Sequence, residues 1–419
     1  MPEPPRLVQI AEFDRPQAGS FIPMFAGVLG LARERGWRTT AVLPAAAERA
    51  EWIDQIRGVA EVELAPGSVL GSRRARGEWL TETLRAGSAP TVLHTHFTAW
   101  DVAALIASRH IDASSVPVFW HVHSALPHDP AVVARSVVKF GVLGRGVAGI
   151  LCPAPNIALG VQQRLGPEER VHFIPSALDA SLYPLADAST RAAARRELDL
   201  PADAEVVLHF GWHPYLKGTD IFLRMLRDLM AEDERVIGVV RGHEPESEVM
   251  ARDLGIAERV RFQSPVPNAA SLFAAADVVV SSSREEGMAY TVLEALSSGT
   301  PVVATAIPGH AYIGERVAAC RITSIEPSGL MAATKAMLSL AEDERARMGA
   351  EAHRWIVENL SVRAIGERML GLYERELPPT VAASVATPAD ARVTDPTVHR
   401  TSRPTVLAIA EFANETPAA

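Results

Sequence analysis

Short runs of apolar residues recur along this chain, and each is followed by a polar or glycine-containing loop and then by apolar residues at helical spacing. The clearest unit starts with the β-branched run 278–280, continues through a polar loop at 284–287, becomes helical from Tyr290, and ends in a second apolar run at 301–304. An uninterrupted β-branched run is typical of a strand buried on both faces. The pattern predicts a strand, a loop, a helix and a second strand, with the loop at the strand's carboxyl end.

The same alternation extends over most of the chain. Apolar runs predict further strands at 7–11, 39–43, 91–95, 116–122, 149–152, 171–175, 205–210, 236–240 and 259–262. Helical spacing predicts helices at 21–35, 130–147, 219–230, 328–340, 343–359 and 361–377, the last with Ser361 as its N-cap. Strands that alternate with helices predict the α/β class, with two doubly wound parallel sheets.

The composition suits a globular protein and excludes several classes. The chain has 419 residues, of which 48% are hydrophobic, and a formal net charge of −9. An acidic chain without a basic patch argues against nucleic-acid binding. Cys152 and Cys320 lie far apart, as expected for buried thiols in a reducing compartment. The absence of a long apolar run or secretory leader predicts a cytoplasmic protein, with peripheral contact at the inner membrane face left open.

Two carboxylates, Glu286 and Glu294, flank the predicted loop and the start of its helix. Backbone N–H groups at 287–291 lead into the helix N-terminus, where unpaired donors and the helix dipole favour a diphosphate. Glu294 lies too deep in the helix to cap it, but it can accept hydrogen bonds from sugar hydroxyls beside the phosphates. The alternative is that Glu286 is a surface acid and Glu294 a solvated helix residue.

The stretch EGMAYTVLEALSSGTPVVAT, from Glu286 to Thr305, resembles the nucleotide-sugar site of family 4 glycosyltransferases, and Glu286 and Glu294 fall on that family's E-x7-E motif. The resemblance covers residues 6–377 and is strongest after Ala193. It implies the GT-B fold, in which two Rossmann-like domains face a cleft. It also implies transfer of a sugar from a nucleotide-sugar to an acceptor hydroxyl, with retention and without a metal.

The same resemblance implies roles for particular residues. Lys217 aligns with a family lysine that binds the donor diphosphate. Trp212 stands where the family has an arginine that binds the same diphosphate. Glu286 would bond the transferred sugar, Glu294 the ribose, and His123 the acceptor side. The implied catalytic residues are His123, Lys217 and Glu286. The implied donor-binding residues are Gly19, Trp212, Lys217, Val266, Glu286, Gly287, Met288, Ala289, Tyr290, Thr291 and Glu294.

Histidines at two strand ends raise the question of a metal site. His94 and His96 alternate along one strand, and His121 and His123 along another. Zinc requires three or four converging ligands. Because no acid accompanies these pairs, we expect them not to converge on a metal. The sequence also contains no Asp-x-Asp, so we expect no metal ligand and no cofactor other than a nucleotide-sugar co-substrate, UDP- or GDP-linked.

The resemblance divides the chain into four parts: an acceptor domain at 1–185, a nucleotide-sugar domain at 186–360, a helix at 361–377 that returns to the first domain, and a tail at 378–419. The tail is rich in Pro, Ala and Thr and is expected to be disordered. The expected partners are the donor and a sugar, lipid-linked or small-molecule acceptor; the oligomeric state stays open. Two other functions remain: a protein that binds nucleotide-sugar without turnover, suggested by Trp212, and a nucleotide-sugar epimerase.

Overall fold

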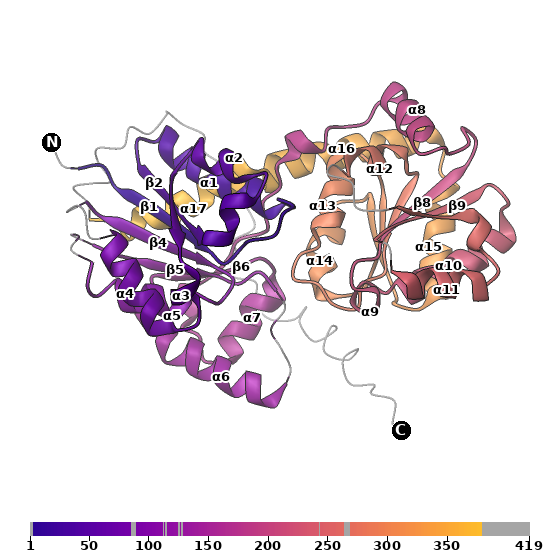
Figure 1. The fold of residues 1–419 in the computed structure, drawn as a ribbon. Helices are drawn as coiled ribbons and strands as arrows, with labels where there is room; N and C mark the ends of the chain where they lie inside the picture. The colour runs from indigo at the N-terminus through magenta and orange to yellow at the C-terminus, as the bar shows by residue number, and fades with distance from the viewer. Residues whose placement is uncertain are drawn as a thin grey trace. The chain divides into compact units, whose positions relative to one another are not determined.

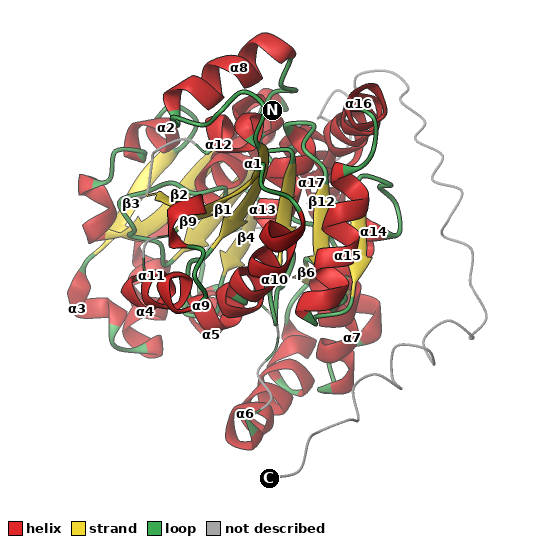
Figure 2. Ribbon diagram, turned by 90° about the vertical axis from the view of Figure 1, so that its right-hand side faces the viewer, coloured by secondary structure: helices red, strands yellow, loops and turns green. Residues whose placement is uncertain are grey.

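Two parallel β-sheets, each covered by helices on both faces, form the part of the chain that the structure describes (Figures 1 and 2). The structure is a computed structural model and describes residues 3–84, 89–111, 113, 115–124, 126, 129–242, 244–263 and 269–378. Both sheets belong to one compact unit, Met1–Ser384. The predicted site residue Val266 and nearly all of the predicted tail lie outside the described residues.

The first sheet has seven strands in the order β3-β2-β1-β4-β5-β6-β7, and all neighbouring strands are parallel. Its strands are β1 (Arg6–Ala11), β2 (Arg38–Pro44), β3 (Glu61–Ala65), β4 (Thr91–His96), β5 (Val118–His121), β6 (Gly149–Cys152) and β7 (Val171–Phe173). Every residue of β1 and β4 is buried, which explains their uninterrupted runs, because central strands of such a sheet are covered on both faces.

Helices cover the two faces of the first sheet separately. One apolar layer includes α1 and α2, and the other includes residues of α4, α5, α6 and α7. The helices of this half are α1 (Phe21–Glu34), α2 (Ile53–Arg57), α3 (Gly67–Leu70), α4 (Arg73–Leu84), α5 (Asp101–Ala107), α6 (Pro130–Gly141) and α7 (Pro155–Gln163). The helix predicted at 130–147 is shorter, because a 3₁₀ turn at Leu143–Gly146 follows α6.

The second sheet has six parallel strands in the order β10-β9-β8-β11-β12-β13. Its strands are β8 (Glu205–Phe210), β9 (Val236–Arg241), β10 (Val260–Gln263), β11 (Val278–Ser281), β12 (Val302–Thr305) and β13 (Cys320–Thr323). Its helices are α8 (Ala188–Glu197), α9 (Pro214–Lys217), α10 (Thr219–Glu232), α11 (Pro245–Asp253), α12 (Ala270–Ala275), α13 (Tyr290–Ser297), α14 (Pro308–Gly314), α15 (Pro327–Leu338) and α16 (Glu342–Leu360).

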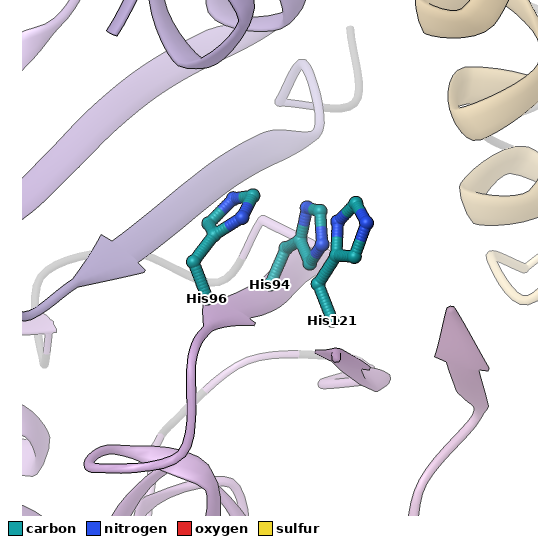
Figure 3. Close-up of side chains that lie close together, drawn as sticks. All are labelled: His94, His96 and His121. Atoms are coloured by element: carbon teal, nitrogen blue, oxygen red, sulfur yellow. The ribbon is translucent and has the colours of Figure 1, made fainter. Parts of the chain in front are cut away.

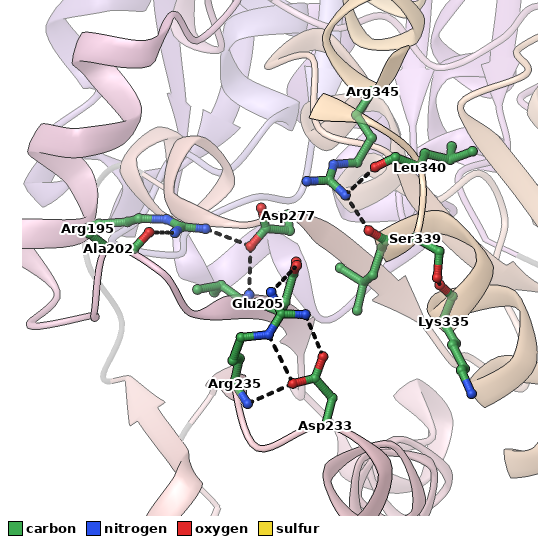
Figure 4. A network of polar contacts seen from close by, with 12 residues as sticks. Arg195, Ala202, Glu205, Asp233, Arg235, Asp277, Lys335, Ser339, Leu340 and Arg345 are labelled. Atoms are coloured by element: carbon green, nitrogen blue, oxygen red, sulfur yellow. Dashed lines mark hydrogen bonds and ion pairs between the residues drawn. The ribbon is translucent and has the colours of Figure 1, made fainter. Parts of the chain in front are cut away.

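A buried aspartate fixes the first helix of the second half to its sheet (Figure 4). Asp277, just before β11, is bonded by Arg195 of α8 at 2.6 Å, as Figure 4 shows. Arg191 of the same helix bonds it at 2.8 Å. Its Oδ2 also accepts the backbone N–H of Val206 at 2.7 Å. Because a buried carboxylate needs several charged or polar partners, this arrangement anchors α8 to the second sheet.

The last helix, α17 (Val362–Arg375), lies against α1 of the first half. Ser361 caps it by accepting the backbone N–H of Ala364. It packs against α1 so closely that a Cβ on Gly366 would meet Leu31 at 2.5 Å. Arg35, next to α1, bonds Glu367 and Glu374 of α17. The helix is therefore fixed to the first half through packing and ion pairs.

Two strands were missing from the sequence-based prediction. β3 carries Glu61 and Glu63 and is largely half-buried, so its apolar run is broken; β13 has the same partly exposed pattern. The cysteines are buried and unbridged, as expected.

Among the described residues, none of the helices combines the length and the apolar character that crossing a membrane requires.

Candidate functional site

The loop between β11 and α13 lies where the sequence predicts it, at the carboxyl end of a central strand. Ala289, the N-cap of α13, makes no side-chain cap bond, and no acidic residue lies in the first turn. The first amides of a helix have no partner within the helix. The start of α13 is therefore suited to an anionic ligand, and the predicted strand, loop, helix and strand are confirmed.

Lys217 and Glu286 meet in this site. The Lys217 Nζ lies 2.5 Å from Glu286 Oε1, and the Ser283 hydroxyl donates to the same oxygen at 2.8 Å. Both charged side chains are partly exposed, at 27% and 13%. Since an ammonium has three donors, Lys217 can keep its hydrogen bond to Glu286 and still donate one to an incoming anion.

Gly218 explains how Lys217 reaches this position. It has a left-handed backbone, with φ +66°, and a Cβ there would lie 2.0 Å from the Ser282 carbonyl oxygen. The Ser282 hydroxyl in turn donates to the carbonyl oxygens of Lys217 and Gly218, at 3.1 and 2.9 Å. A glycine is needed here because only it permits both the turn and the close approach of α9 to the end of β11.

Glu294 is buried, which excludes the alternative of a solvated helix residue. Its side chain accepts hydrogen bonds from Ser20, which precedes α1, and from the Tyr183 hydroxyl at 3.1 Å. Burial raises the pKa of Glu294 from its ordinary value, while the two hydrogen bonds and the charges of Arg241 and Lys217 oppose that shift. The first half of the chain thus contributes directly to the surroundings of this glutamate.

His123 lies beside the same loop. A Cβ on Gly287 would approach the His123 carbonyl oxygen to 2.7 Å, so the two backbones are in close contact. The His123 Nε2 is 2.9 Å from His96 Nδ1, and His96 Nε2 is 3.0 Å from Gln9 Oε1. Burial lowers the pKa of His123 to about 3, so the imidazole is neutral at pH 7.

The other predicted donor-binding residues occupy three kinds of position. Gly19 and Trp212 are exposed, Trp212 at 38%. Met288 and Ala289 are buried in the apolar core, so only their backbone can face a ligand. Tyr290 and Thr291 are half-buried in the first turn of α13.

Three residues near the site were not predicted: Ser20, Tyr183 and Arg241. Arg241 ends β9, opposite Phe210 of β8, and its charge acts on Glu294. The turn after it packs on the loop that carries Trp212, since a Cβ on Gly242 would lie 3.0 Å from the Trp212 backbone nitrogen. Arg241 is therefore a cation beside the position of the missing arginine. Its place at the end of a central strand was the available sequence signal.

Arg284, the first residue of the polar loop at 284–287, makes a structural contact. Its guanidinium bonds both carboxylate oxygens of Asp220, at 2.8 and 2.9 Å, and lies over the Tyr215 ring. This bidentate pair holds Arg284 against the start of α10. Its guanidinium therefore serves a structural contact with Asp220.

Three of the strand-end histidines lie close together, which their alternation along each strand did not predict. In the first sheet, His96 pairs directly with His121 on the neighbouring strand. One ring nitrogen from each of His94, His96 and His121 lies within 4.8 Å of the others, and the three rings project to the same side (Figure 3). Alternation along each strand places both members of a pair on one face, and the parallel register then brings the two pairs together.

Comparison with protein families identifies both halves. Residues 28–182 match the family described as glycosyltransferase family 4, and residues 204–343 match the one described as glycosyl transferases group 1. The chain is 32% identical over 263 residues to D-inositol 3-phosphate glycosyltransferase 1 of Catenulispora acidiphila, which covers 56% of this chain and 60% of that protein. A homologous enzyme of Xylanimonas cellulosilytica is 30% identical, with 52% and 56% covered. The chain thus matches little more than half the length of these curated relatives.

Solved structures share the fold at low sequence identity. HepE from Anabaena, solved in complex with UDP and glucose, superposes with a TM-score of 0.72 at 18% identity and covers 88% of this chain and 98% of its own. Sucrose-phosphate synthase from Thermosynechococcus elongatus gives 0.68 at 17% identity, with 89% and 99% covered. These likenesses confirm the predicted GT-B fold of two Rossmann-like halves.

Proposed function

The chain belongs to family 4 of the glycosyltransferases, and we propose that it transfers a sugar from a nucleotide-sugar to an acceptor hydroxyl, with retention. The observation that carries the proposal is the meeting of Lys217 and Glu286 beside the N-terminus of α13, with Glu294 further along that helix. A cation, helix amides and two carboxylates match a diphosphate next to two hydroxyl-rich rings.

In the proposed reaction, the bond between the donor's anomeric carbon and the phosphate oxygen breaks, and the acceptor oxygen bonds that carbon on the same face. The acceptor hydroxyl's proton passes to the departing diphosphate. Lys217, Arg241 and the amides at the start of α13 stabilise the charge that grows on the diphosphate, so this step is proposed to need no divalent metal. Glu294 holds the ribose, and Glu286 bonds the transferred sugar.

His123 is proposed to contact the reacting sugar or acceptor through its neutral ring. The hydrogen-bond chain from Gln9 through His96 supports this assignment. The Gln9 Oε1 accepts, so His96 carries its proton on Nε2 and presents Nδ1 to a proton on His123 Nε2. The His123 Nδ1 then keeps a lone pair, which suits an acceptor for a sugar hydroxyl.

The donor is proposed to be UDP- or GDP-linked, and UDP is supported by the solved Anabaena protein, whose structures contain UDP and UDP-glucose. The relatives' name suggests a phosphorylated cyclitol as a first acceptor to test, beside other sugars and lipid-linked acceptors. We also propose that residues 1–185 and 186–360 act as the acceptor and donor domains.

Contact with the inner face of the cytoplasmic membrane is proposed for α6. Val138 of α6 and Val142, which directly follows it, are 57% and 64% exposed, and Arg135 and Arg145 are exposed nearby. Exposed apolar side chains among basic ones suit an anionic bilayer. Flotation with anionic vesicles should recover the parent chain, and Val138→Asp should abolish this recovery; absence of binding by the parent would refute the contact.

The function is tested by incubating the full chain with a panel of UDP- and GDP-sugars, with and without inositol phosphate and simple sugar acceptors. Acceptor-dependent release of nucleotide, and a product whose anomeric coupling in NMR matches the donor's, is the expected result. Donor binding without turnover would favour the binding-only alternative. A new nucleotide-sugar formed without any acceptor would establish an epimerase.

A further inference from the structure

A polar layer lies within the core of the first half, between the sheet and helices α1 and α17. His94, His96 and His121 occupy adjacent positions of β4 and β5, and each is at most 2% exposed. Ring centroids are 4.2 Å apart for His94 and His96, 5.3 Å for His96 and His121, and 5.4 Å for His94 and His121. Such a dense group of imidazoles is unusual in a core position, where apolar side chains normally lie.

Two nitrogens of this group lack hydrogen-bond partners among the described residues. They are His94 Nε2 and His121 Nδ1, and both are fully buried. An unsatisfied buried polar atom costs about 1–3 kcal/mol. Such atoms in a native core call for a water or an ion that completes them.

Neighbouring side chains orient two of the rings. The Tyr373 hydroxyl of α17 lies 2.7 Å from His94 Nδ1, and Gln9 Oε1 of β1 lies 3.0 Å from His96 Nε2. Metal-binding histidines usually donate their second ring N–H to such an oxygen, which fixes the tautomer and leaves the other nitrogen for the ion. Here this arrangement leaves His94 Nε2 and His96 Nδ1 as lone-pair nitrogens, beside the unpartnered His121 Nδ1.

We propose that His94, His96 and His121 bind one divalent ion of the zinc class. Ligand nitrogens about 2.0–2.1 Å from zinc stand roughly 3.3 Å apart in a tetrahedral site, and one ring nitrogen from each of the three histidines already lies within 4.8 Å of the others. Imidazole ligands suit Zn²⁺, Cu²⁺, Ni²⁺ and Co²⁺ better than Mg²⁺ or Ca²⁺.

The fourth position of the ion has a neighbour of its own. The His123 Nε2 stands 2.9 Å from His96 Nδ1. When the ion takes the lone pair of His96 Nδ1, the hydrogen bond from His123 to that atom is given up, and a water completes the site. The ion connects β4 to β5 and, through Tyr373, both strands to α17. Its effect is therefore on the stability of the first half, and it is independent of how the donor diphosphate is neutralised.

The test uses the untagged full chain, unfolded, freed of metal by a chelator and refolded with Zn²⁺, with Co²⁺ or with no metal, because buried ligands admit an ion most readily during folding. We expect one equivalent of zinc by elemental analysis after gel filtration. We also expect visible absorption from tetrahedral Co²⁺ and a higher melting temperature with metal. Less than one tenth of an equivalent, together with Co²⁺ that shows no such absorption, would overturn the proposal.

Variants separate this site from surface binding. His121→Gln should weaken metal binding at least tenfold, whereas His110→Gln, at an exposed histidine, should leave affinity unchanged. Equal loss in both variants, or loss in neither, would assign the metal to the surface. If His121→Gln does not fold, His94→Gln replaces it, and the stoichiometry and spectrum of the parent still decide.

Discussion

The two halves of this protein use the same kind of sheet but place different chemistry at the ends of its central strands. In the first half, β4 and β5 end in histidines that are buried and close to one another. In the second half, β9 ends in Arg241, and the segments that follow β8 and β11 bring Lys217 and Glu286 together. Neutral imidazoles suit hydroxyl groups or a metal, while paired charges suit a diphosphate.

This difference shows that the parallel sheet sets only where ligands bind, at the carboxyl ends of strands. The side chains found there decide what binds. The halves are also coupled, since Ser20 and Tyr183 from the first part of the chain bond Glu294, and His123 lies against Gly287. The variants described next test whether a residue acts at the charged strand ends of the second half, at the neutral strand ends of the first half, or in the contact between the halves.

The largest effect is expected for Lys217→Ala. Loss of a preorganised cation beside the departing diphosphate should reduce turnover about 10²–10³-fold. Initial rates with a saturating donor measure it, and Lys335→Ala, which removes a largely exposed lysine paired with Glu232, is the matched control. Turnover near that of the parent would remove Lys217 from the mechanism. Trp212→Arg, combined with Lys217→Ala, should recover only part of the loss.

Glu294→Ala should weaken donor binding by about 1.5–3 kcal/mol, the scale of a hydrogen bond to a charged group. Calorimetry with the donor measures this affinity, and Glu358→Ala, at an exposed position of α16, controls for a change in surface charge. An unchanged donor affinity would show that Glu294 does not hold the ribose.

Arg241→Gln tests whether a neighbouring strand supplies the cation that is missing at Trp212. Arg241 is half-buried and its charge reaches Glu294, so its removal should lower affinity for the free nucleoside diphosphate about tenfold, toward the weak end of the range for charged hydrogen bonds. Arg235→Gln, near the start of β9 and mostly exposed, should have no effect. Equal affinities in both variants would leave Lys217 as the main side-chain cation.

How much of this site follows from sequence depends on the range of the contacts. The strand, loop and helix at 278–297 follow from local periodicity, and Lys217, Glu286 and Glu294 follow from resemblance. Contacts between distant segments do not, because Ser20 and Glu294 are 274 positions apart. The histidine group was missed for a related reason: alternation along each strand was visible, but the register between β4 and β5 was not.

His123→Ala should lower turnover more than donor affinity, because its ring is proposed to contact the reacting sugar or the acceptor. Loss of one neutral hydrogen bond corresponds to about 0.5–1.5 kcal/mol, so turnover should fall by up to about tenfold. Steady-state kinetics and donor calorimetry separate the two quantities, with His110→Ala as an exposed control. A variant that fails to fold would assign His123 to the core of the first half instead.

The smallest effect is a change in stability with pH, measured on Glu294→Gln. Burial raises the pKa of Glu294 above its ordinary 4.5, so the folded chain holds this proton more tightly than the unfolded chain does. As pH rises from the unfolded pKa through the folded one, the parent loses that stabilisation, and above the folded pKa the loss is complete. Glutamine has no such titration and can still accept from Ser20 and Tyr183. The free energy of unfolding of the variant minus that of the parent should therefore increase between pH 5 and pH 8, as measured by urea unfolding at each pH. A difference that does not vary with pH would show that the folded chain does not raise the pKa of this carboxyl group within that range.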